Sequence, residues 1–255
     1  MFSRLANAVV PVLAGLTVTT DPGSEPAPGS IIAANHTSLA DPAVVMAALH
    51  RLGISPVVLA TAGLWRIPVL GRALAREGHI PVHRNTQLAS AALDDAAAAL
   101  AAGRIVLIYG EGRLPRRADA AEAPPEAFRS GLARLALATG APVVPLGQAG
   151  ARRLSSGSGP KQLAGVLTAP LRRPAVHVHL GAPVHLTGDA ATATTQAREA
   201  VTAAWRTAAR RLGDSSPDGT PLGGSALAGS PREDSPRDDS PREDREPPAA
   251  QGRAA

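Results

Sequence analysis

The sequence predicts an α/β domain in which a mainly parallel central sheet is flanked by helices. Two observations predict it. Short apolar runs of strand length alternate along the chain with stretches of helical composition, the order typical of parallel sheets with helical crossovers. The length of 255 residues suits one domain with an appendage, and the composition changes sharply near Leu212.

The expected strands are short, apolar and bounded by turn residues. The most apolar run is Arg104–Tyr109 (RIVLIY), which we expect to be buried. In chain order, the expected strands cover residues 30–34, 56–60, 79–82, 104–109, 142–146 and 175–180.

The expected helices between these strands carry start and stop signals. Asp41 is expected to be an N-cap, with Pro42 at the first helical position. Gly103 and Gly140 each end an Ala- and Leu-rich helix. In chain order, the expected helices cover residues 42–51, 64–75, 86–102, 129–139 and 192–212.

Both ends of the chain differ from this domain, which we place at residues 16–212. Residues 1–15 are mostly apolar but short, and are expected to form a helix that lies on a membrane surface or packs on the domain. Residues 213–255 repeat Ser-Pro-Arg followed by two acids, starting at Ser230, Ser235 and Ser240. The repeat has no apolar residue to bury, so we expect a disordered tail.

Charge and composition narrow the possible partners. The tail has nine acids and five arginines, which leaves the rest of the chain strongly basic within a net charge of +5. A basic domain favours anionic lipid, phosphorylated substrates or nucleic acid. Five aromatic residues in all argue against nucleic acid, where bases stack on aromatic side chains. The absence of Cys excludes disulfides and cysteine nucleophiles, and no apolar run reaches the roughly 18 residues of a membrane span.

The first candidate for chemistry is the pair His36 and Asp41, at the turn between an expected strand and an expected helix. Such turns often form ligand sites in α/β sheets. A histidine suits proton transfer near neutral pH, and a nearby carboxylate can fix its tautomer. The alternative is a capping aspartate beside an unrelated histidine, and the spacing alone leaves both open.

Three further blocks also lie at the ends of expected strands. Arg84 ends the block that starts at Gly78, and its guanidinium could clamp a phosphate or be merely solvated. Glu111-Gly112-Arg113 follows the most apolar strand. This block is either a functional site or an ordinary turn with a surface ion pair. Residues 141–145 (APVVP) indicate only a strand.

Other kinds of site have little support in the sequence. There is no Gly-x-Ser-x-Gly, and the segment 157–161 lacks the spacing of a P-loop. His177, His179 and His185 lack a carboxylate pattern for zinc, so we expect a solvated strand face there. Residues 150–174 hold five basic residues and no acid, and could meet anionic headgroups or simply face solvent.

Taken in order, the four blocks resemble the PlsC-like glycerolipid acyltransferases, the family of 1-acyl-glycerol-3-phosphate acyltransferase. That family has a His-x4-Asp block, a Gly-x-Ile-x-x-x-Arg block, Glu-Gly-Thr-Arg, and a Val-Pro-x-x-Pro-like strand. Here these are similar to His36/Asp41, residues 78–84, residues 111–113 and residues 141–145. The resemblance covers roughly residues 16–187.

The resemblance implies a function and roles for these residues. His36 would be the general base on the free hydroxyl of a lysophospholipid, and Asp41 would orient it. Arg84, Glu111, Gly112 and Arg113 would bind the acceptor's phosphate. The donor would be acyl-CoA or acyl-carrier protein, with no metal and no other cofactor, and the product phosphatidic acid. The enzyme would act peripherally, on the cytoplasmic face of the cell membrane, with no nucleic-acid partner.

The third block departs from the family. It is Tyr-Gly-Glu-Gly-Arg-Leu over residues 109–114, where the family usually has Phe-Pro-Glu-Gly-Thr-Arg-Ser. Arg116 is therefore an alternative phosphate contact to Arg113. Thr61 and Gly63 also stand where relatives often have Lys and Glu. Two alternatives to phosphatidic acid synthesis remain: the same chemistry on another lysolipid or a glycolipid, and a non-catalytic protein that binds lipid or acyl carrier.

Overall fold

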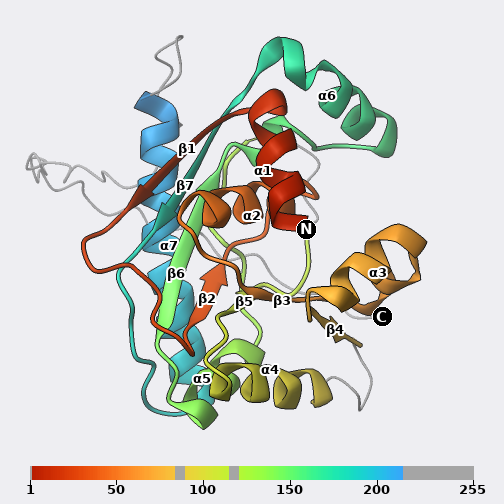
Figure 1. Cartoon of the computed structure of the whole chain (residues 1–255). Helices are drawn as coiled ribbons and strands as arrows, with labels where there is room; N and C mark the ends of the chain where they lie inside the picture. The colour runs from red at the N-terminus through yellow and green to blue at the C-terminus, as the bar shows by residue number, and fades with distance from the viewer. Residues whose placement is uncertain (1, 84–89, 115–120, 215–255) are drawn as a thin grey trace, which may run out of the picture. The chain divides into compact units, whose positions relative to one another are not determined.

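The protein folds around a single, mainly parallel sheet flanked by helices, as the sequence predicts, and the sheet has seven strands. The computed structural model describes residues 2–83, 90–114 and 121–214 (Figure 1). The strand order is β1-β7-β6-β2-β5-β3-β4. The strands are β1 (Gly15–Thr20), β2 (Ile31–Ala34), β3 (Val57–Thr61), β4 (Ile80–Val82), β5 (Val106–Tyr109), β6 (Val143–Ala149) and β7 (Ala175–Leu180).

The sheet is mainly parallel. β6, β2, β5, β3 and β4 run in one direction, so their carboxyl ends meet at the same edge. β7 is antiparallel to β6, and β1 pairs parallel with β7. The two exceptions therefore lie together at one side of the sheet.

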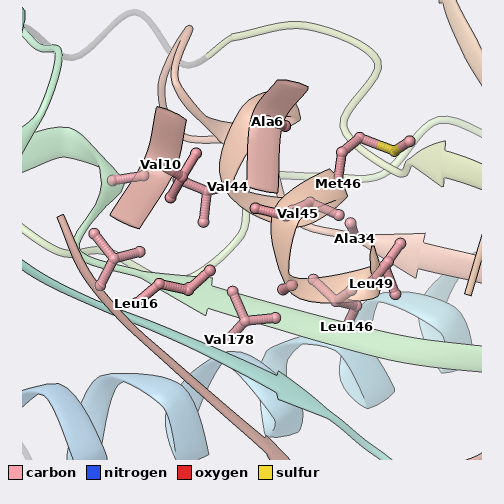
Figure 2. Packing of buried hydrophobic residues seen from close by; sticks show 14 of the residues in the cluster. Ala6, Val10, Leu16, Ala34, Val44, Val45, Met46, Leu49, Leu146 and Val178 are labelled. Atoms are coloured by element: carbon pink, nitrogen blue, oxygen red, sulfur yellow. The ribbon is translucent and has the colours of Figure 1, made fainter. Parts of the chain in front are cut away.

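Helices cover both faces of the sheet (Figure 1). Alternation along β2 shows the two cores, because Ile32 and Ala34 enter one apolar cluster while Ile31 and Ala33 enter the other. Figure 2 shows the first cluster, in which Leu49 of α2 lies near Leu146 of β6. The helices are α1 (Phe2–Leu13), α2 (Asp41–Arg51), α3 (Pro68–Arg76), α4 (Ala91–Ala101), α5 (Gly131–Thr139), α6 (Gly159–Arg172) and α7 (Ala190–Asp214).

Two elements were not predicted from the sequence, and each is poorly buried. β1 is an edge strand with a Thr-rich, half-exposed pattern. α6 buries only Ala169, so it has no buried stripe to reveal it in the sequence. The expected helix 64–75 is split into a short 3₁₀ helix (Ala62–Arg66) and α3, since Pro68 favours an extended conformation at the residue before it.

The expected N-cap of α2 is wrong by one position. Ala40 is the N-cap, and Asp41 is the first residue of the helix. The Asp41 carboxylate instead accepts the backbone N–H groups of Thr37 and Ser38, in the loop that leads into the helix. The side chain thus organises the loop before α2.

The chain ends only partly match the expected boundaries. Residues 213 and 214 continue α7, and the rest of the expected tail lies outside the described residues. Residues 2–13 form the expected N-terminal helix, which packs on α2. Among the described helices, none has the length and apolar character needed to cross a membrane.

Candidate active site

Strand register places three polar side chains in one row at the carboxyl edge of the sheet. Ala34, the last residue of β2, pairs with Tyr109 of β5 on one side and with Leu146 of β6 on the other. Two residues further along the chain from each of these positions are His36 and Glu111, just past the ends of β2 and β5, and Gln148, within β6. Since adjacent strands lie about 4.8 Å apart, these side chains, far apart in sequence, share one site.

His36 and Asp41, the expected catalytic pair, are brought into contact by the turn between them. His36 Nδ1 lies 2.9 Å from Asp41 Oδ2. The Asp41 side chain is fully buried, and it also accepts the backbone N–H groups of Thr37 and Ser38, the latter at 2.9 Å. A buried carboxylate held by several donors cannot swing away, so it fixes the imidazole.

This contact assigns the roles of the two ring nitrogens. With Asp41 as acceptor, Nδ1 carries the hydrogen, and Nε2 is left as the basic nitrogen. The ring of Tyr109 packs against His36, with centroids 4.5 Å apart and planes tilted by 32°. Burial and the nearby Asp41 raise the pKa of Tyr109 well above its usual range, so the phenol stays neutral.

Glu111 is a buried carboxyl group next to the same loop. Its Oε2 accepts the backbone N–H of His36 at 3.2 Å, and Oε1 is buried with no hydrogen-bond partner among the described residues. Burial is the main cause that raises the pKa of Glu111 to about 8, and the charge of Asp41 adds to it. Glu111 is therefore mostly uncharged at neutral pH.

Glycines on either side of Glu111 permit this position. Gly112 has φ +66°, in the left-handed region that favours glycine. A Cβ on Gly110 would overlap the ring of Phe128. The Gly-Glu-Gly sequence thus turns the chain tightly enough to direct Glu111 toward His36.

Gln148, near the end of β6, and Arg152, after it, complete the site, and sequence reasoning did not place either of them there. Asn35 and Gln148 exchange two hydrogen bonds, Nδ2 to the carbonyl at 3.0 Å and backbone N–H to Oδ1 at 2.8 Å. Gln148 Nε2 also donates to Thr37 Oγ1 at 3.0 Å, and buried Arg152 donates to the Thr37 carbonyl at 2.9 Å. Their signal in the sequence was their position after the expected strand 142–146, but β6 extends three residues beyond that predicted end.

A pocket opens beside the His36–Asp41 pair. It is lined by His36, Thr37, Glu111, Ala121, Ala123, Pro124, Pro125, Glu126 and Arg152. The pocket therefore joins a base, a buried acid and a buried guanidinium, and part of its wall comes from the Ala- and Pro-rich stretch after residue 120.

The expected phosphate-binding residues are not all at this pocket. Arg113 is half exposed, and its guanidinium lies 3.5 Å from the Glu126 carboxylate. Arg84 and Arg116 lie outside the described residues. Residues 143–145 of the fourth block begin β6, where they are buried.

The expectation of a solvated face at the histidines of β7 is wrong. His177 and His179 are 3% and 5% exposed, and Thr19 Oγ1 lies 3.0 Å from a ring nitrogen of each. The cause is β1, the unpredicted strand that carries Thr19 beside β7. His185 is exposed. Across the described part of the chain, no group of three or more His, Asp or Glu residues could hold a metal ion.

Comparisons with known proteins bear on the family and the fold. Residues 16–148 match the family model described as Acyltransferase. The fold is similar to the crystal structure of the 1-acyl-sn-glycerophosphate (LPA) acyltransferase PlsC from Thermotoga maritima, with a TM-score of 0.60 and 17% sequence identity. That similarity covers 80% of this chain and 78% of the other. No curated protein matches the chain in sequence.

Proposed function

The chain belongs to the PlsC-like acyltransferase family, and from this premise we propose that it makes phosphatidic acid. It would move a fatty acyl group from acyl-CoA or acyl-carrier protein to the free hydroxyl of 1-acyl-glycerol-3-phosphate, at the cytoplasmic face of the cell membrane. The observation that carries the proposal is the His36–Asp41 contact of 2.9 Å at the wall of a pocket. Both residues lie within the range that matches the family model, residues 16–148.

The proposed reaction is one acyl transfer without a covalent enzyme intermediate. His36 Nε2 takes the proton of the acceptor hydroxyl as its oxygen attacks the thioester carbonyl. The carbon–sulfur bond then breaks, and the proton on Nε2 passes to the departing thiolate. Asp41 stabilises the imidazolium that forms between these steps. The thioester is already activated, so the chemistry asks for neither a metal nor another cofactor.

The acceptor's phosphate would be held by Arg84, Glu111, Gly112 and Arg113. An ionised carboxylate would repel a phosphate, but burial keeps Glu111 largely protonated at neutral pH. In that form it can donate a hydrogen bond. Arg152, which lines the pocket, adds positive charge on the side of the Thr37 carbonyl. This arrangement favours an anionic acceptor.

The test is to incubate the purified full chain with lysophosphatidic acid and a labelled acyl-CoA. The phosphatidic acid formed is then detected by its mass. We expect phosphatidic acid from the wild type and a loss of about 10²- to 10⁴-fold in His36→Ala, the range for a general base. His185→Ala is the matched control, since that histidine is exposed and distant in sequence from the site. Equal turnover by His36→Ala and the control would refute the role of His36.

A different acceptor is the second candidate, and the third block favours it. Arg113 takes the place of the family's Thr, and its guanidinium faces Glu126 at 3.5 Å. A panel of lysolipid and glycolipid acceptors at equal concentration separates the two. Preference for lysophosphatidic acid over all others supports phosphatidic acid synthesis, and preference for an acceptor without a phosphomonoester rejects it. Binding without turnover across the panel would indicate a non-catalytic protein.

A further inference from the structure

Large apolar side chains are exposed mainly on two helices that touch each other. Of the eleven exposed large apolar residues in the described chain, seven lie on α1 and α6. The helices are in contact, and Arg173 Nη2 donates to the Pro11 carbonyl at 3.1 Å (Figure 1). The seven are Leu5, Val9 and Val12 on α1, and Leu163, Val166, Leu167 and Leu171 on α6.

On each helix these residues form a stripe. Leu5, Val9 and Val12 are spaced by four and three, and Ala6 and Val10, on a neighbouring face of α1, enter the core next to α2. On α6 the four residues fall within an arc of about 120–140° at 100° per residue. Leu171 is 90% exposed, and α6 buries only Ala169. Such stripes cost free energy in water, so they mark a surface that meets an apolar partner.

The charges around the stripes select the partner. Residues 2–20 contain Arg4 and no acid, and residues 150–174 contain five basic residues and no acid. Arg4, Lys161 and Arg172 are exposed. An apolar helix face bordered by cations and free of acids fits the interface of an anionic bilayer, where apolar side chains enter the acyl region and cations meet phosphates.

A short segment before α6 connects this surface to the active-site loop. Ser38, in the loop that holds His36, donates to the Ser155 carbonyl at 2.7 Å, and Arg152 donates to the Thr37 carbonyl. α6 begins at Gly159, four residues after Ser155, a span of at most about 14 Å. Docking through α6 would therefore bring the pocket close to the lipid surface. α6 also lies beyond the residues that match the family model.

We propose that α6 is a membrane-docking helix that works together with α1, and that their exposed faces bind anionic lipid in the bilayer interface. The proposal rests on the proposed function for its purpose, because a lipid acceptor must reach His36 from a membrane. The binding itself is independent of catalysis, so the two are tested separately.

The test is sedimentation of the full chain with vesicles of phosphatidylcholine, with and without phosphatidylglycerol. We expect binding to the anionic vesicles and a loss of about 100-fold in Leu167→Gln/Leu171→Gln, as two leucines no longer enter the acyl region. Ile67→Gln/Val69→Gln on and before α3 is the matched control, since these side chains are also exposed. All these positions are on the surface, and equal melting temperatures would verify folding.

The preference of this surface for anionic lipid is tested by neutralising two basic side chains. Arg4→Gln/Lys161→Gln should weaken binding to anionic vesicles by about 30-fold, at the usual contribution of a basic residue near a charged membrane. The matched control is Arg206→Gln/Arg210→Gln, two exposed positions on α7. Binding that is equally strong on both kinds of vesicle would overturn the preference for anionic lipid.

Three results would overturn the docking surface itself. They are no vesicle binding by the wild type, full binding by the leucine variant, and a loss of binding in the α3 control equal to that in the leucine variant.

A fourth result would also overturn it. If the wild type were a dimer without vesicles and the leucine variant a monomer, the partner of this surface would be a second copy of the chain. His36→Ala should bind vesicles normally, and the leucine variant should retain turnover on a short-chain, monomeric acceptor. Failure of the proposed function would abolish turnover on every acceptor and leave vesicle binding intact.

Discussion

Replacing Glu111 with Gln should make the protein more stable at alkaline pH. In the folded state the pKa of Glu111 is raised to about 8 from an ordinary value of 4.5, mainly by burial. The unfolded chain ionises near 4.5, so the fold bears no charge penalty below that pH. The penalty grows as pH rises from 4.5 to about 8 and is constant above it.

The size of the effect follows from this difference in pKa. At about 1.4 kcal/mol per pH unit, the free energy of unfolding loses about 2 kcal/mol by pH 6 and on the order of 5 kcal/mol by pH 8. Gln has the same shape and no charge, and its carbonyl can accept the His36 N–H. The free energy of unfolding of the variant should therefore not decrease with pH for this reason. Any effect of the buried amide on that free energy is the same at every pH.

The assay is urea unfolding of wild type and Glu111→Gln at pH 5, 6, 7 and 8. The free energy of Glu111→Gln relative to wild type should rise steadily over this range. Glu199→Gln on α7 is the control, because it makes the same substitution at an exposed position. A difference between wild type and Glu111→Gln that is the same at pH 5 and pH 8 would refute a buried, protonated Glu111.

Three further predictions concern the site and the core. Asp41→Asn should lower kcat by about 10²- to 10⁴-fold, because an uncharged amide in contact with His36 Nδ1 no longer stabilises the imidazolium that forms during the reaction; steady-state kinetics decide it. Gly147→Ala should destabilise by about 3 kcal/mol or more, since a Cβ would overlap the backbone of α7, and thermal unfolding would show whether the fold accommodates it. Leu107→Ala in the centre of β5 should cost about 2–5 kcal/mol in urea unfolding, and a cost below 1 kcal/mol would contradict its complete burial.

The central strands could be predicted from the sequence because buried strands consist mainly of apolar residues. β2 and β5 are short apolar runs, and both lie in the middle of the sheet. β1 and α6 escaped prediction because neither buries a full face. A pattern of apolar residues predicts elements that are buried. It gives no signal for an element that lies at the edge of the sheet or on the surface.

For the site, a contact within one loop could be predicted from the spacing of its residues. Contacts between residues on different strands could not. The His36–Asp41 pair is local, so five positions and a turn were enough to suggest it. Gln148 and Arg152 reach the same loop from more than one hundred residues away, and their place depends on which strands are neighbours. The strand order follows from packing of the whole domain, and no local pattern gives it.

The two buried carboxyl groups beside His36 have opposite surroundings, and this separates their roles. Asp41 accepts hydrogen bonds from the imidazole, from two backbone N–H groups and from the Thr37 hydroxyl. Glu111 has one oxygen buried without a partner among the described residues, and burial favours its neutral form. Two carboxylates ionised together here would each raise the cost of the other. With Glu111 protonated, Asp41 alone supplies negative charge to the imidazole, and Glu111 can face an anionic acceptor without repelling it.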